Sequence, residues 1–205
     1  MALFARQRNI SRRSWLLAGL GIPLFRASAE TFSVSYDGDN LHLAAPDLHF
    51  LTGRALSRLK DADTVTFLSQ ISLSDERGVI FRRHAERVVV SYALWKEKFA
   101  VTIPGASVRT TMHNTAAQAE AWALDNLAIS ALGVPPDRPF WLRFELRAAN
   151  QKELSSVVGD TGISIPRVVE FLSRKSSAEN PVLVRTKGPL RLANLPRTVV
   201  HGRSG

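Results

Sequence analysis

The sequence contains no cysteine in 205 residues. This absence excludes disulfide bonds, metal sites built from thiolates and catalysis by a cysteine nucleophile. The chain also lacks an apolar run of about 20 residues, the length that a helix needs to cross a bilayer. Stability therefore has to come from packing of a core, and the hydrophobic content of 45% is ordinary for a globular domain.

Acidic residues are absent from the first 29 positions, which carry five arginines. The whole chain has 27 basic and 18 acidic residues and a formal charge of +9. Without the five N-terminal arginines, 22 basic residues and a net charge of +4 remain, which is ordinary for a single domain. Basic pairs such as Arg82-Arg83 are interleaved with acidic residues such as Glu86. The charge therefore gives no support for a nucleic-acid partner.

The N-terminal segment has the three parts of an export signal. Arg12 and Arg13 lie in a basic region, the apolar run 16–25 follows, and Ala27 and Ala29 supply the small residues before a cleavage site. The arginine pair, with an aromatic residue and a leucine shortly after it, resembles the twin-arginine consensus. We expect the export translocase to recognise this signal, and cleavage to release a periplasmic or otherwise extracytoplasmic protein without a transmembrane segment. The general secretory route is the alternative.

Residues 30–196 read as one domain, between the signal at 1–29 and a flexible tail at 197–205. Alternating apolar residues and turn residues between them indicate strands. The expected strands are residues 31–36, 41–43, 64–73, 79–94, 99–103, 107–112 and 140–146, with a last apolar piece at 182–195.

Three segments of this domain have helical periodicity. The first begins at Asp47 and ends near Asp61, the second runs from Asn114 or Thr115 to Leu132, and the third begins near Pro166. Residues 151–164 are polar and contain glycine, which favours a disordered loop. The pattern predicts an α+β fold in which a mainly antiparallel sheet, a meander or sandwich-like arrangement, packs with two to three helices.

One segment resembles a known family. Residues 88–102 read Val-Val-Val-Ser-Tyr-Ala-Leu-Trp-Lys-Glu-Lys-Phe-Ala-Val-Thr, and residues 188–196 read Gly-Pro-Leu-Arg-Leu-Ala-Asn-Leu-Pro. Both are similar to segments of exported bacterial proteins grouped as domain of unknown function 4390, and the resemblance extends over about Phe32 to Pro196. It implies an extracytoplasmic location and a similar fold. The family has no established activity, so it implies no catalytic residues.

Catalytic motifs give a single lead. Asp160-Thr161-Gly162 matches the triplet that places an aspartic-protease carboxylate on a turn, where two such carboxylates share one proton. The glycine before Asp160 and the absence of a second triplet favour a plain turn. The five histidines show no metal-binding spacing, and no phosphate loop, dinucleotide fingerprint or serine-hydrolase elbow occurs. The sequence therefore predicts no metal, no cofactor and no catalytic residue.

Two hypotheses for the function remain open. The favoured one is a non-enzymatic binding or assembly module that takes an envelope protein or a hydrophobic ligand on its sheet face or in a groove beside the Trp122 helix. The alternative is a hydrolase of unrecognised type, with Asp160 as the only named residue. Trp95, between predicted strands, is expected to cover their connection as an amphipathic plug. It is also the candidate for contact with a partner.

The export signal gives a first prediction. Changing both Arg12 and Arg13 to lysine keeps the charge but removes the guanidinium geometry that the twin-arginine receptor reads, so export should be lost. Cell fractionation measures this loss, and mass spectrometry of the exported parent should find Glu30 at its N-terminus. Export of the lysine variant at the parental level would instead identify the general secretory route.

Overall fold

The computed structural model describes residues 32–105, 107–159, 162–177 and 180–198. The export-signal residues Arg12, Arg13, Ala27 and Ala29 lie outside the described residues, as does Asp160. The predictions that concern them are therefore unchanged by the structure. Within the described ranges, no helix is long and apolar enough to span a bilayer.

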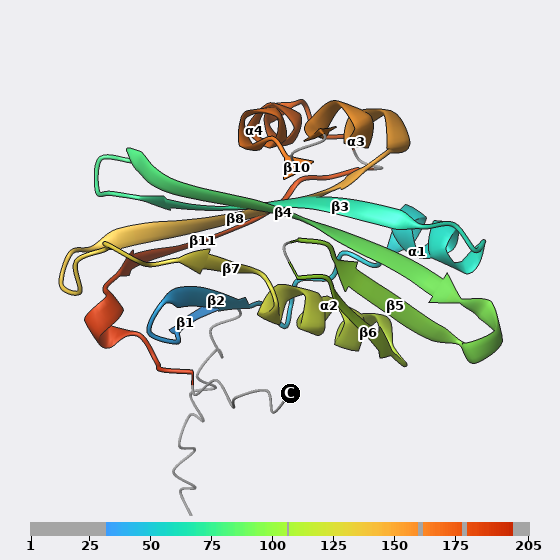
Figure 1. The fold of residues 1–205 in the computed structure, drawn as a ribbon, viewed down its shortest axis with the longest axis horizontal. Coiled ribbons are helices and arrows are strands. Elements are labelled where there is room, and N and C mark those ends of the chain that lie inside the picture. The colour runs from blue at the N-terminus through green and yellow to red at the C-terminus, as the bar shows by residue number, and fades with distance from the viewer. Residues whose placement is uncertain (1–31, 106, 160–161, 178–179, 199–205) are drawn as a thin grey trace, which may run out of the picture.

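A six-stranded antiparallel sheet forms the middle layer of the molecule (Figure 1). Its strand order is β11-β8-β3-β4-β5-β6. The bounds are β3 (Val65–Ser74), β4 (Ile80–Ala93), β5 (Lys98–Ile103), β6 (Arg109–His113), β8 (Phe140–Ala149) and β11 (Leu183–Leu190). Nine of the ten residues of β3 are buried because elements pack on both faces of the sheet. The predicted antiparallel α+β fold is thus confirmed.

The larger core lies below the sheet in the view of Figure 1. The elements there are the small antiparallel sheet of β1 (Ser33–Tyr36), β2 (Asn40–Ala44) and β7 (Ala128–Ser130), together with α1 (Gly53–Lys60), α2 (Ala116–Asp125) and the 3-10 turn η2 (Leu192–Asn194). Alternate residues of the central strands face this core, among them Phe67 and Ile71 of β3. Phe140, Leu142, Phe144 and Leu146 of β8 do the same, as their alternation predicts.

A smaller core lies above the sheet. It is covered by α3 (Gln151–Val157), the short strands β9 (Val158–Gly159) and β10 (Gly162–Ile163), and α4 (Ile165–Ser173). Leu68 of β3 packs here against Val168 and Phe171 of α4. Arg147 of β8 is buried, and its Nη1 atom donates to the carbonyls of Phe171 and Arg174 at 3.2 and 3.3 Å. These bonds place a cation at the C-terminal end of α4 and fasten the helix to the sheet.

The expected loop at residues 151–164 is wrong, because residues 151–157 form the helix α3. A capping box starts this helix. The side chain of Asn150 accepts from the backbone of Glu153 at 2.9 Å, and the Glu153 carboxylate accepts from the backbone of Asn150 at 2.8 Å. With α3, the described residues contain four α-helices instead of two or three.

The first helix begins at Gly53 and not at Asp47. The reason lies in α2, where the carboxylate of Glu120 is buried. It accepts from the backbone amides of Phe50 and Leu51 at 2.6 and 2.5 Å. These bonds hold the segment before α1 as a loop, because the amides of Phe50 and Leu51 donate to a side chain of another helix. Asp47 pairs instead with Arg185 of β11 at 3.3 Å.

The second helix ends at Asp125, although the sequence predicts a helix up to Leu132. Asn126 ends it by donating from its side-chain amide to the Trp122 carbonyl at 2.9 Å. Residues 128–130 then pair with β2 as β7, which buries Ile129 and leaves Leu132 62% exposed. Apolar residues at alternate positions 127, 129 and 131 fit this strand better than they fit a helix.

The first two residues of the predicted flexible tail, Arg197 and Thr198, contact β1. Arg197 forms a bridge with Tyr36, and the amide of Thr198 donates to the Tyr36 carbonyl at 3.0 Å. The amide of Tyr36 donates in turn to the Pro196 carbonyl at 3.0 Å. The chain is therefore held against β1 at least as far as Thr198.

The contact between Gly188 of β11 and Trp141 of β8 gives a second prediction. A Cβ atom on Gly188 would lie 2.4 Å from Cδ1 of the Trp141 indole. Gly188→Ala should therefore lower the free energy of unfolding by about 1–3 kcal/mol through overpacking. Gly159→Ala is the control, because a Cβ there meets nothing within 4 Å. Equal stability of the two variants in chemical denaturation would contradict the close packing of Trp141.

Candidate strand-binding edge

The long strand β4 has one side that is only partly covered. β3 pairs with β4 from Ile80 to Val90, whereas β5 pairs only with Val89 to Ala93 on the other side. In the ranges that the structure describes, no strand pairs with this side of β4 between Ile80 and Val88. We call these nine residues the open edge of β4. Unpaired backbone on such an edge is a template for another strand.

Proline explains where the pairing of β4 with β5 stops. Thr102 lies opposite Val89, so two further residues would bring Pro104 opposite Arg87. Proline has no amide hydrogen and cannot donate to the strand beside it. The ladder consequently ends at Thr102, and the chain leaves the sheet after Ile103 to form the connection to β6.

The backbone direction along the open edge follows from one side-chain contact. The hydroxyl of Ser69 on β3 donates to the carbonyl oxygen of Glu86 at 2.9 Å, so this carbonyl points toward β3. Hydrogen-bonding directions alternate along an antiparallel strand. The amides and carbonyls of the neighbouring Ala85 and Arg87 must therefore point away from β3, to the open side. Among the described residues, no strand pairs with these groups.

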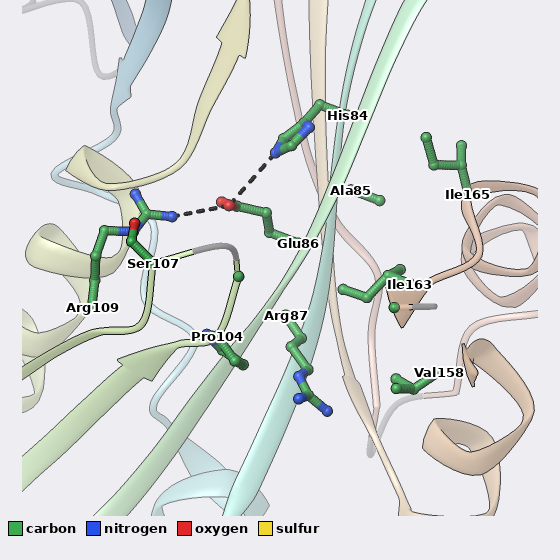
Figure 2. A pocket seen from close by; sticks show the side chains of 12 residues that line it. His84, Ala85, Glu86, Arg87, Pro104, Ser107, Arg109, Val158, Ile163 and Ile165 are labelled. Carbon is green, nitrogen blue, oxygen red and sulfur yellow. Dashed lines mark hydrogen bonds and ion pairs between the residues drawn. The ribbon is translucent and has the colours of Figure 1, made fainter. Parts of the chain in front are cut away.

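A cavity of about 810 Å³ lies directly at this open edge (Figure 2). One wall comes from the connection between β5 and β6 and from the start of β6, and contains Pro104, Ser107 and Arg109. The opposite wall comes from β9, β10 and α4 and is apolar. Its side chains are Val158, Ile163 and Ile165, which Figure 2 shows across β4 from Arg109. The open edge therefore runs between a polar wall and an apolar wall.

An arginine, a glutamate and a histidine meet on the polar side. Nη2 of Arg109 lies 2.9 Å from Oε1 of Glu86, and the second nitrogen of this guanidinium donates to the backbone carbonyl of Asn126. Nε2 of His84 lies 3.6 Å from the same Glu86 oxygen. The other oxygen, Oε2, is buried and has no hydrogen-bond partner among the described residues. Oε2 is thus not exposed to the cavity, whose polar side is formed by the Glu86–Arg109 ion pair and Ser107.

Arg109 pairs with the Glu86 carboxylate on this side of the cavity. In the described ranges, no hydrogen bond joins His84 to the hydroxyl of Ser107. Among the residues described, no group of three histidine, aspartate or glutamate side chains could hold a metal ion.

The groove expected beside the Trp122 helix corresponds to a smaller cavity of about 260 Å³ between α2 and the loop after β2.

The structure places three histidines beside carboxylates, which the spacing of these residues in the sequence does not indicate. His42, His49 and His84 each lie within 4 Å of a carboxylate, on Asp37, Glu120 and Glu86. Only the His84 pair lies in the large cavity. The sequence gives no sign of the Glu120 contact, since 71 residues separate the partners.

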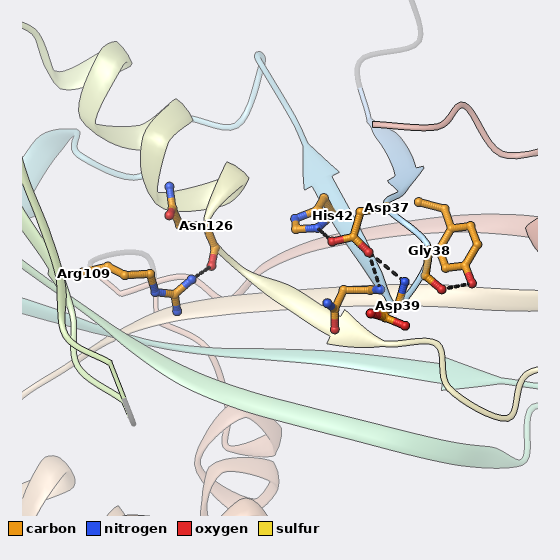
Figure 3. Close-up of polar contacts among 8 residues, drawn as sticks. Asp37, Gly38, Asp39, His42, Arg109 and Asn126 are labelled. Carbon is orange, nitrogen blue, oxygen red and sulfur yellow. Dashed lines mark hydrogen bonds and ion pairs between the residues drawn. The ribbon is translucent and has the colours of Figure 1, made fainter. Parts of the chain in front are cut away.

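The pair of Asp37 and His42 stabilises the β1–β2 turn (Figure 3). Nε2 of His42 lies 2.7 Å from Oδ2 of Asp37, while Oδ1 accepts from the amides of Asp39 and Asn40 at 2.9 and 2.7 Å. Burial alone would raise the pKa of Asp37. The hydrogen bonds of His42 and of the two amides outweigh it and hold this pKa well below its usual range. The turn is a structural element, and its position on β1 and β2 is separate from the open edge of β4.

Trp95 does not cover the connection that follows β4. It belongs to the 3-10 turn η1 (Leu94–Lys96), and its side chain is fully exposed, at 102% of the reference area. The rings of Tyr92 and Phe99 pack on each other at 4.9 Å and close this end of the β4–β5 pair without it. Glu97 has a left-handed conformation that returns the chain to β5 and leaves Trp95 pointing away. The expected plug is thus wrong, and Trp95 remains a candidate for contact with a partner.

Comparison with protein-family models, curated proteins and solved structures finds no match to this chain. The resemblance of residues 88–102 and 188–196 to domain of unknown function 4390 therefore stays a prediction. A function can therefore be proposed only from the geometry of the open edge, the cavity and the exposed turn.

The Asp37 carboxylate gives a third prediction, on pH dependence. Its pKa is lower in the folded than in the unfolded chain, so it stabilises the fold above a pH of about 4, and this contribution is lost as the pH falls below that value. Asp37→Asn should lower the free energy of unfolding by about 1 kcal/mol at pH 7. The difference from the parent should shrink at pH 3. Asp39→Asn, at an exposed neighbour, is the control; a difference independent of pH in denaturant titrations would contradict this account.

Proposed function

We propose that this protein is a non-enzymatic binding module that accepts an extended segment of a partner protein as an added strand on the open edge of β4. One observation carries the proposal: the outward backbone groups of Ala85 and Arg87, with which no described strand pairs, lie at a cavity of about 810 Å³. Strand addition uses main-chain hydrogen bonds for affinity and the pockets beside them for selectivity. Both are available at this edge.

The backbone groups supply the binding position. An incoming strand lies in line with β5, beyond the point where Pro104 ends the pairing, and bonds to the outward groups of Ala85 and Arg87. The added strand can run parallel or antiparallel to β4, because each outward residue of β4 offers one donor and one acceptor. The ladder that β5 leaves unfinished is then continued by the partner.

The two walls select the side chains of the partner. Residues of an added strand alternate between the two sides of the sheet. On one side they meet Val158, Ile163 and Ile165, which favours an aliphatic residue. On the other side they meet the Glu86–Arg109 ion pair and Ser107, which favours a polar residue.

The charge of the edge favours an acidic partner. Three arginines, at positions 82, 83 and 87, lie along the open edge. Its single acidic residue, Glu86, is paired with Arg109. An aspartate or glutamate near the bound segment would thus gain favourable Coulomb energy and associate faster at low salt. Together with the expected export signal, this supports an envelope protein with an exposed acidic, β-prone segment as the partner.

Synthetic peptides give a fourth prediction. The probes are fluorescein-labelled five-residue peptides of alternating valine and threonine with one aspartate. The tightest binder is then N-methylated on one or the other alternating set of amides. Methylation of the set that faces β4 should abolish binding, because those amides donate to the edge, whereas methylation of the other set should leave most of it. Fluorescence anisotropy measures both affinities.

Two matched protein variants accompany the peptides. Ala85→Pro removes an amide that faces the open side within the cavity, so it should abolish binding without loss of a bond to β3. Arg83→Pro makes the same change two residues farther along, outside the cavity lining, and should retain most of the binding. Thermal unfolding of both variants confirms that they are folded. Equal tolerance of both methylated peptides, or tight binding to the Ala85 variant, would refute strand addition.

A further inference from the structure

The turn between β4 and β5 carries the most exposed large hydrophobic side chain among the described residues. Trp95 is completely exposed, and Leu94 beside it is 48% exposed. Lys96 and Lys98 are exposed on the same turn, where Glu97 is the only acid. Figure 1 shows that this turn forms one end of the molecule along its longest axis. Nothing in the described part of the fold covers it.

Trp95 contributes no packing to the fold. The end of the strand pair is closed by Tyr92 and Phe99, so the fold does not need a tryptophan at this position. A tryptophan held in water on the tip of a hairpin exposes its whole indole at a cost in free energy. The position therefore points to a partner that surrounds a protruding side chain.

We propose that Trp95 and Leu94 insert into the interfacial region of a lipid bilayer with anionic headgroups. Tryptophan combines an apolar ring with an N–H donor and concentrates at the level of the headgroups. Lysines immediately beside it add electrostatic attraction to anionic lipids, on the order of a fivefold gain in affinity for each charge near the surface. Two lysines against one glutamate provide this complementarity at the tip.

Insertion of the tip would also orient the open edge of β4. Glu86 lies nine residues before Trp95, seven of them along β4 and two along η1, which corresponds to at most about 27 Å. The open edge would stand at this height above the lipid, within reach of a membrane-anchored partner. The lipid contact does not rest on the strand-binding proposal, since it uses other residues and another end of the molecule.

Single-cysteine labelling of the full chain tests the proposal, because the natural sequence has no cysteine. Leu94→Cys carries an NBD fluorophore at the tip, and Val79→Cys carries it on the opposite hairpin, where the replaced side chain is 60% exposed. The probes are vesicles of phosphatidylcholine alone and vesicles with 30% phosphatidylglycerol. Since the two labelled proteins share the same N-terminal segment, any binding through that segment is equal in both.

The tip label alone should shift to the blue and brighten on the anionic vesicles, and less so on the neutral ones. Adding Trp95→Ala to the tip-labelled chain should weaken partition at least about fivefold, and Lys96→Glu with Lys98→Glu should remove the preference for anionic lipid. An equal response of the two labels, or no response of the tip label on either vesicle, would overturn the proposal. Unchanged partition of the Trp95 variant would overturn it as well.

Discussion

Every amide and carbonyl of a β-strand needs a partner in the sheet, in another molecule or in water, and β4 meets this requirement unevenly. Its 14 residues are covered by β3 over most of their length, but by β5 only at the last five. The uncovered part does not face open water alone. It runs between Arg109 on one side and the apolar residues of β9, β10 and α4 on the other. The proposed strand binding depends on this difference in length between the β3–β4 and β4–β5 ladders.

The rest of the fold keeps the open edge rigid. β3 is buried on both faces, so its neighbour β4 is fixed in register from Val65 opposite Val90 onward. Two buried ionic side chains fasten the flanking layers. Arg147 binds the last carbonyls of α4 above the sheet, and Glu120 binds the loop before α1 below it. A preorganised edge of this kind loses little conformational entropy when a strand is added.

Local patterns predicted β1 to β6 and β8 but missed β7, β9 and β10, and long-range contacts decided where the elements end. The alternation from Phe140 to Leu146 was enough to predict which side chains of β8 face the core. The start of α1 was not predictable, because a carboxylate from residue 120 holds the loop before it. The open edge arises from two ladders of different length, which no local pattern encodes. Pro104 was its only sign in the sequence.

Amide hydrogen exchange on the ¹⁵N-labelled protein tests the central claim most directly, since it reads each backbone group of β4 separately. In the free protein the amides of Ala85 and Arg87 should exchange rapidly, while those of His84 and Glu86, which face β3, should be protected. A bound valine–threonine peptide should slow Ala85 and Arg87 and leave the other two unchanged. Protection of Ala85 and Arg87 in the free protein, or no change at either residue on peptide binding, would contradict the account.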